Sequence, residues 1–255
     1  MAPWIAHLRV AKALSDGMAV DKVAFAYGSL APDSGIPNAD GTAFDPPKEV
    51  THFLRRGEGE DQIRDIEFYQ DYVAAGPHFE DAFEDNSFRL GYFCHLLCDN
   101  LWVRRINTTY KKRYPELINN PTSPMWQTLK GDWFDLDFCY LRDHPDFSFW
   151  RIIMTMPNPP TCLPFISDAG FTHSLNHIRH FYSTPNPQHN IDHPYIYLNQ
   201  TTMSRYVEDT AALILKICRL PQTNPPLDGL NSAVHLLDTA EYAPYAPPFG
   251  DAPQI

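Results

Sequence analysis

The spacing of apolar residues constrains the fold of this chain more than any other feature of its sequence. Several segments repeat apolar residues with the 3.6-residue period of a helix, and no segment alternates persuasively with the period of two that a half-buried strand requires. The pattern therefore predicts an all-α protein. We expect helices near residues 4–15, 19–28, 61–74, 79–106, 125–142, 170–182 and 199–219.

Proline-rich segments separate the expected helices, because proline cannot continue a helix. The longest segment, 31–59, exceeds the connection that a compact helical bundle usually needs, which is typical of a functional loop. We expect a single multi-helix domain over 1–220. Residues 221–255 contain PQTNPP and APYAPPFGDAP, and this Pro-rich tail is predicted either to pack on the body of the protein or to be disordered.

Composition excludes several classes of protein. A formal net charge of −11 opposes binding to a nucleic-acid duplex through a basic face. Five cysteines without framework spacing do not indicate a disulfide scaffold and fit a reducing compartment. No apolar run approaches the roughly 18 residues of a transmembrane helix, and the first residues lack the apolar core of a signal peptide. We therefore expect no transmembrane segment and a cytoplasmic protein.

One face of the expected helix over 79–106 carries two side chains that can bind a cation. Phe88, Tyr92, His95, Asp99 and Trp102 follow the spacing of a single helical face, with His95 and Asp99 one turn apart among aromatic residues. An aspartate buried without a partner would be costly, and a metal ion or an arginine would remove that cost. A His–Asp hydrogen bond inside the core explains the same pair.

Three further side chains extend this pair to a possible ligand set. His7 lies on the apolar face of the first expected helix, and the loop over 31–52 contributes Asp33 and His52. Each also has an ordinary explanation, as a core histidine, a turn aspartate and an exposed histidine. Together the three imidazoles and two carboxylates suit Zn²⁺ or a similar divalent transition-metal ion. Because five ligands exceed the need of one tetrahedral zinc, we expect two ions bridged by Asp99.

Four strings within the first 105 residues resemble a known family. AHLRVAKAL (6–14), YGSLAPDSG (27–35), PPKEVTHF (46–53) and LGYFCHLLCDNLW (90–102) occur in the order found in the zinc-dependent phospholipase C family, within the phospholipase C and S1/P1 nuclease superfamily. The resemblance implies an all-α domain that binds a cluster of zinc ions and hydrolyses phosphate esters.

The resemblance also implies a role for each residue of the set. It assigns Asp33, His52, His95 and Asp99 to one zinc ion, and His7 together with Asp99 to a second. It further implies that Asp33 is a catalytic residue, which helps to deprotonate the attacking water.

The chain departs from the well-studied secreted members of the family in two places. Those members place a further histidine a few residues beyond the bridging aspartate, and then a His-x-x-x-Glu pair, as a third metal site. Here position 105 is Arg105 and no such pair follows, so that site is absent or rebuilt from other residues such as Asp132, Asp135 or His144. The secreted members also use a free α-amino group as a ligand, whereas methionine removal here would expose Ala2 at a different spacing.

Other polar clusters have two interpretations each. His173, His177 and His180 share a helical face, which indicates either a separate ion site or a polar face rich in histidine. The Asp-rich segment 130–146 lines the mouth of the site or is a solvated helix face. Arg55 and Arg56 either bind phosphate oxygens or are surface charges. We interpret Cys94 and Cys98 as small buried side chains.

The residues and the resemblance together predict a zinc-dependent hydrolase of phosphate esters. Two metal ions would activate a water molecule, and Asp33 would accept its proton. The expected substrates are small-molecule or lipid phosphate esters, with phospholipid head groups and nucleotides as the leading classes. Two alternatives stay open on this evidence: hydrolysis of a different ester or of an amide at the same centre, and a non-catalytic metal-binding protein.

Overall fold

Helices form the framework of the protein, which confirms the predicted all-α class. The structure is a computed structural model and describes residues 2–39, 43–115, 124–184, 190–220, 227, 229–247 and 249–250. Strand in these residues is confined to β1 (Ile36–Pro37) and β2 (Phe44–Asp45), an antiparallel pair. No helix in the described part of the chain is both long enough and apolar enough to cross a lipid bilayer.

The first two helices begin directly after a proline and after a capping aspartate. α1 (Trp4–Gly17) follows Pro3, and its buried face includes His7. α2 (Lys22–Gly28) starts three residues later than predicted, because the side chain of Asp21 accepts a hydrogen bond from the backbone N–H of Ala24 and so caps the helix at that point.

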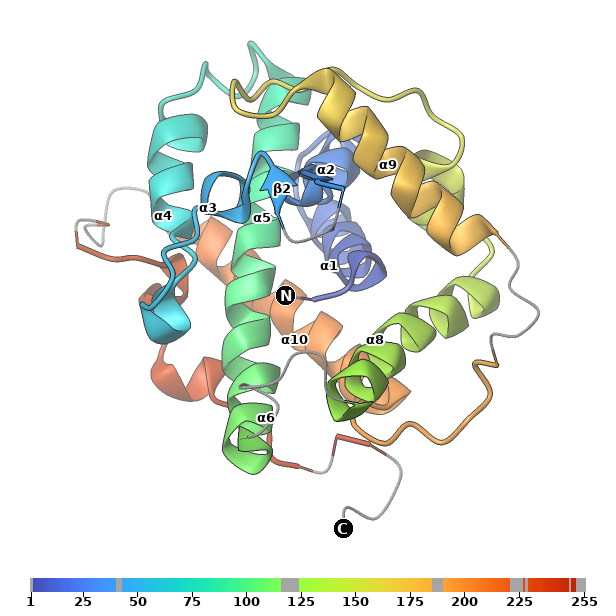
Figure 1. Cartoon of the computed structure of the whole chain (residues 1–255). Coiled ribbons are helices and arrows are strands. Elements are labelled where there is room, and N and C mark those ends of the chain that lie inside the picture. Colours follow the sequence, from blue (N-terminus) through green and yellow to red (C-terminus); the bar gives the residue numbers. More distant parts are fainter. Residues whose placement is uncertain are drawn as a thin grey trace.

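The longest apolar pattern forms the central helix of the fold. α5 (Phe83–Trp102) runs through the middle of the view in Figure 1, with α1 on one side and the segment that contains α3 and α4 on the other. Its path continues through one π-helical stretch, η4 (Val103–Asn107), into α6 (Thr108–Arg113). The sequence predicts one helix over 79–106, and the structure starts it later and extends it further. The change to π-helical geometry after Trp102 is a feature that a 3.6-residue period does not predict.

Three amphipathic helices complete the framework within two residues of their predicted ends. They are α8 (Pro124–Asp143), α9 (Asp168–Ser183) and α10 (Gln200–Arg219). Side chains cap two of them: Ser167 accepts from the N–H of Gly170 at the start of α9, and Asn199 accepts from the N–H of Thr202 at the start of α10. The apolar period predicted these helices, and the capping residues fix where two of them start.

The predicted helix over 61–74 is interrupted, and the loop before it contains short elements. The segment is built from η2 (Gly59–Asp61), α4 (Asp65–Phe68) and the π-helical η3 (Tyr69–Ala74). The preceding loop holds η1 (Ala31–Asp33) and α3 (Lys48–Thr51). Later connections hold η5 (Phe149–Ile153), η6 (Ala233–Leu236) and η7 (Thr239–Tyr242). These elements are too short to show a helical period in the sequence.

Two glycines bring α2 and α5 into close contact. A Cβ atom built on Gly28 would lie 2.0 Å from the carbonyl oxygen of Phe88, and one built on Gly91 would lie 2.3 Å from the carbonyl oxygen of Phe25. Real Cβ atoms do not approach so closely, so only glycine allows the two backbones to meet here. The crossing sets the position of the next turn of α5, which carries His95.

The described part of the C-terminal tail packs on the helical body. Ala233, Tyr245 and Phe249 are buried. The buried carboxylate of Asp65 accepts hydrogen bonds from the backbone N–H of Ala233 at 2.8 Å and from the side chain of Asn100 at 2.6 Å. This polar link ties η6 to α4 and α5.

Candidate metal centre

Four segments of the chain bring five titratable side chains together in the interior. α1 contributes His7, η1 contributes Asp33, the residue after α3 is His52, and α5 contributes His95 and Asp99. Two groups of potential ligand atoms lie within 4.8 Å of one another: His7 with His95 and Asp99, and Asp33 with His52 and His95. Within the described residues, no other histidine, cysteine or carboxylate belongs to such a group.

The carboxylate of Asp99 faces imidazoles with both of its oxygens. Oδ1 lies 3.3 Å from His7 Nε2, while Oδ2 lies 3.7 Å from His95 Nε2 and 3.8 Å from His52 Nε2. A tetrahedral zinc ion with bonds of about 2.0–2.1 Å separates its ligand atoms by about 3.3 Å. The observed separations are therefore close to those of a coordination sphere, with Asp99 placed between two sets of nitrogen atoms.

Asp33 lies at the edge of the cluster, with its side chain 15% exposed. Its Oδ1 is 3.4 Å from His52 Nε2, and its Oδ2 accepts a hydrogen bond of 3.0 Å from the indole N–H of Trp4. Burial alone would raise the pKa of Asp33, but the neighbouring His52 and Lys48 lower that pKa well below its ordinary value. The Asp33 carboxylate is thus ionised at neutral pH and fixed in orientation.

Several polar atoms at this point have no hydrogen-bond partner among the residues that the structure describes. They are both ring nitrogens of His7, Nε2 of His52, Nε2 of His95 and Oδ2 of Asp99, and all four side chains are no more than 2% exposed. A buried polar atom without a partner costs free energy. Nitrogen and carboxylate oxygen atoms that converge without hydrogen bonds are what a divalent metal ion requires. The residues present therefore fit a zinc-type ion.

The other ring nitrogens of two of these histidines are held in place by the fold. His95 Nδ1 donates a hydrogen bond of 2.8 Å to the carbonyl oxygen of Ser29, directly after the α2–α5 crossing. His52 Nδ1 lies 2.9 Å from the hydroxyl oxygen of Thr51. Such bonds fix the orientation of an imidazole and leave its Nε2 as the coordinating atom. The helix crossing thereby positions one ligand of the candidate centre.

Electrostatic interactions separate the protonation states of the two stacked histidines. The rings of His7 and His95 are nearly parallel, with centroids 3.7 Å apart. Burial, followed by the proximity of His7, lowers the pKa of His95 to about 3. Burial opposes a charge on His7 as well, but Cys98 and Asp99 raise the pKa of His7 well above its ordinary value. These interactions favour a proton on His7 beside an ionised Asp99. Burial opposes the charge on Asp99, but the positive charge of the amino terminus, followed by His7 and His95, lowers its pKa.

The candidates for a rebuilt third metal site have other partners. Asp132 is buried and accepts hydrogen bonds from the backbone N–H groups of Tyr197 and Leu198. Asp135 pairs with His193 at 2.8 Å. His144 is exposed and stacks on the ring of Tyr140 with a centroid separation of 3.9 Å. None of the three joins the five-residue cluster.

The remaining sequence candidates also lie outside the cluster. His173, His177 and His180 are exposed on α9, and in the described residues they form no group that could hold an ion. Arg55 and Arg56 pair with Glu67 and Glu49 at the surface.

Arg105, the position at which the resemblance would have implied a histidine ligand, is buried and packs over the ring of Tyr245. Its guanidinium contacts Asp209 at 2.9 Å and also donates to the carbonyl oxygen of Glu241. Arg105 therefore anchors the tail.

One residue that the sequence reasoning did not select lies at the candidate centre. Lys48 Nζ is 3.9 Å from Asp33 Oδ1, and Lys48 and Asp33 line a cavity of about 130 Å³. The i, i+4 spacing of Lys48 and His52 could have indicated this position, because side chains at that spacing share a helical face. The other residues that line the cavity are Trp4, Pro32, Gly35, Phe44, Pro46 and Thr51.

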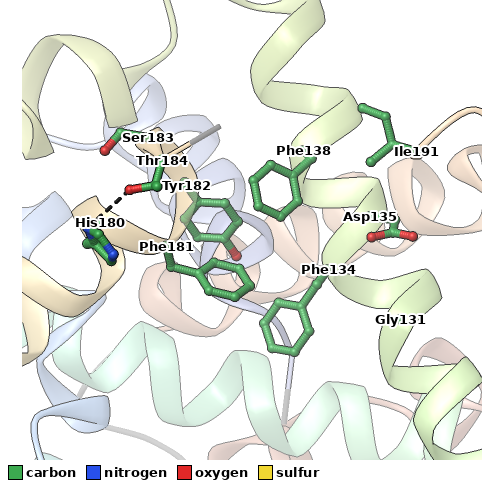
Figure 2. A pocket seen from close by; sticks show the side chains of 10 residues that line it. All are labelled: Gly131, Phe134, Asp135, Phe138, His180, Phe181, Tyr182, Ser183, Thr184 and Ile191. Atoms are coloured by element: carbon green, nitrogen blue, oxygen red, sulfur yellow. Dashed lines mark hydrogen bonds between the residues drawn. The ribbon is translucent and has the colours of Figure 1, made fainter. Parts of the chain in front are cut away.

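A larger cavity of about 680 Å³ lies between α8 and the end of α9. Figure 2 shows Phe134 and Phe138 from α8 beside Phe181 and Tyr182 from α9. The rings of Phe134 and Phe181 each lie 5.8 Å from the ring of Trp4, whose N–H group points to Asp33. Trp4 therefore has the aromatic residues of the larger cavity on one side and the candidate centre on the other.

Comparisons of the chain with protein families, with characterised proteins and with solved structures give no significant match. The geometry of the five side chains is thus the main observation on which a function can be argued.

Proposed function

We propose that this protein is a metal-dependent hydrolase of phosphate esters and that zinc is its metal. The observation that carries the proposal is the convergence of buried imidazole nitrogens with Asp99 Oδ2, atoms that have no hydrogen-bond partner among the described residues. Three imidazoles and two carboxylates are a donor set that favours zinc over the harder Mg²⁺ and Ca²⁺, which prefer oxygen ligands.

Each residue has a distinct part in this proposal. Asp99 offers one oxygen to each side of the centre, so that it would hold two ions, with His7 on one side and His52 and His95 on the other. When bound, such ions lower the pKa of water and neutralise charge on phosphate oxygens. Asp33 lies at the more exposed edge, where it can accept a proton from an incoming water. The hydrogen bond from Trp4 holds it in that position.

Two observations support a phosphate ester as the substrate. The first is the resemblance of four ordered strings to the zinc-dependent phospholipase C family, whose members hydrolyse phosphate esters. The second is the ammonium group of Lys48 in the cavity next to Asp33, because a cation at this position favours an anionic substrate over a neutral ester or amide.

A reconstitution experiment tests the proposal. The purified protein is stripped with a chelator, reloaded with Zn²⁺ and assayed against an aryl phosphomonoester, an aryl phosphodiester, an aryl carboxylic ester and an anilide. We expect hydrolysis of a phosphate ester that the chelator abolishes and zinc restores. His95→Gln should remove the activity, whereas His144→Gln, which changes an exposed histidine outside the cluster, should leave it unchanged.

The same panel separates the alternatives. Zinc-dependent turnover of the carboxylic ester or the anilide alone would contradict a phosphate ester substrate and favour a different hydrolase at the same centre. Stoichiometric zinc without turnover of any substrate class would favour a non-catalytic metal-binding protein.

A further inference from the structure

We propose that Lys48 binds a phosphoryl oxygen of the substrate and gives the site a preference for phosphomonoesters over phosphodiesters. This inference rests on the proposed function and specifies which phosphate esters the site takes. It starts from the position of one ammonium group relative to the candidate centre.

The short helix α3 directs Lys48 and His52 toward the same carboxylate. Pro47 precedes the helix, Lys48 is its first residue and His52 follows its last. Lys48 Nζ lies 3.9 Å and His52 Nε2 lies 3.4 Å from Asp33 Oδ1. An ammonium carries three N–H donors, so Lys48 can keep its contact with Asp33 and still bind another oxygen.

The cavity beside Lys48 makes a charge there effective. Its other lining is largely apolar, with Trp4, Phe44 and two prolines, and among the described residues that line it Lys48 is the single cation. The Lys48 side chain is 28% exposed, so it is partly removed from water. A charge interaction in such surroundings is stronger than one at the surface. The cavity volume of about 130 Å³ suits a small group rather than a polymer segment.

Charge balance at the centre gives the preference for monoesters. With zinc bound, the charge of the ions would outweigh that of Asp33 and Asp99, and the Lys48 ammonium in the adjoining cavity would add a further positive charge for an anionic group to contact. A phosphomonoester carries nearly two negative charges at neutral pH and a diester carries one, so the monoester gains more from the added cation.

Binding of inorganic phosphate to the zinc-loaded protein tests this role without turnover. The variants are Lys48→Met, which removes the charge, and Lys48→Arg, which keeps it. Lys12→Met is the matched control, because Lys12 is a surface lysine that pairs with Asp16 on α1. We expect all variants to hold as much zinc as the wild type. Loss of a charge-assisted hydrogen bond predicts a phosphate Kd roughly 10- to 100-fold higher in Lys48→Met, with most of the affinity regained in Lys48→Arg.

Steady-state kinetics with matched aryl mono- and diesters then tests the preference. In Lys48→Met, kcat/KM for the monoester should fall by roughly 10- to 100-fold, and kcat/KM for the diester should fall several-fold less. Equal phosphate affinity in Lys48→Met and in the wild type, or equal losses for both esters, would overturn the inference. Phosphate binding that depends on Lys48 in a protein without turnover would support the binding role and contradict the hydrolase.

Discussion

Replacing Asp99 with asparagine should remove most of the stabilisation that zinc gives to the folded protein. Asparagine keeps the shape of the side chain and one oxygen, but it loses the charge and the second coordinating oxygen. Because Asp99 lies between His7 on one side and His52 and His95 on the other, the change acts on both halves of the centre at once. His95 belongs to both groups of potential ligand atoms as well, but Asp99 contributes two separate oxygens.

The size of the effect follows from linkage between binding and folding. An ion present at 1,000 times its Kd stabilises the folded state by about 4 kcal/mol. For a domain of about 150–250 residues, close to the 255 of this chain, each kcal/mol shifts Tm by about 2–4 °C. The wild type should therefore melt roughly 8–16 °C higher with zinc than after chelation. Asp99→Asn should show only a few degrees of this difference.

Calorimetry with and without zinc, paired with elemental analysis, measures both quantities. The difference between zinc-loaded and chelated samples of the same variant isolates the effect of the ion, so any loss of stability in the metal-free variant cancels. His144→Gln should behave as the wild type does, because His144 lies outside the cluster and stacks on Tyr140. A full zinc-dependent Tm shift and full zinc content in Asp99→Asn would refute the bridging role of this residue.

Three further predictions follow from features outside the bridging carboxylate. Gly91→Ala should lower the free energy of unfolding by about 1–3 kcal/mol in urea titrations, because the new Cβ would collide with the carbonyl oxygen of Phe25. Gly131→Ala in α8 is the control, because a Cβ there meets nothing within 4 Å, and it should raise the free energy of unfolding by up to about 1 kcal/mol. Burial raises the pKa of Asp65 to about 6, so below that pH the folded state binds a proton that the unfolded state does not. The free energy of unfolding of the wild type, measured relative to Asp65→Asn, should therefore increase by about 1 kcal/mol from pH 7 to pH 5. A decrease over this range would contradict the raised pKa. Zinc binding at pH 7 should release a proton from His7, whose pKa is raised, and isothermal titration in buffers of different ionisation enthalpy should detect it; heats that do not depend on the buffer would count against the assignment.

The long helices were predictable because each buries one continuous face. α8, α9 and α10 follow their apolar periods to within two residues, and their ends coincide with caps such as Ser167 and Asn199. The pairing of His95 with Asp99 was predictable for the same reason, since two residues one turn apart must share a face. The predicted helix over 61–74 was wrong as a continuous element, because residues 62–64 are not helical and Ile63 instead forms an isolated β-bridge with Leu54. From Asp65 the helical path also changes from α to π at Tyr69.

The rest of the site depends on contacts between distant segments, which a local pattern does not contain. The approach of Lys48 to Asp33 depends on the packing of α3 against η1. The partners of Asp132 and Asp135 come from residues more than 50 positions later in the chain, so the sequence could not show that these carboxylates are already engaged. The need for glycine at positions 28 and 91 likewise arises only from the contact between α2 and α5, so it could not be predicted from either helix alone.

The dispersal of the ligands along the chain also determines when the centre can form. His7 belongs to α1, while Asp99 follows more than 90 residues later in the chain. Neither half can capture an ion firmly before α1, the η1–α3 loop and α5 have docked, so metal uptake should be one of the last events of folding. Once in place, the ion would act as a reversible cross-link between α1, the η1–α3 loop and α5.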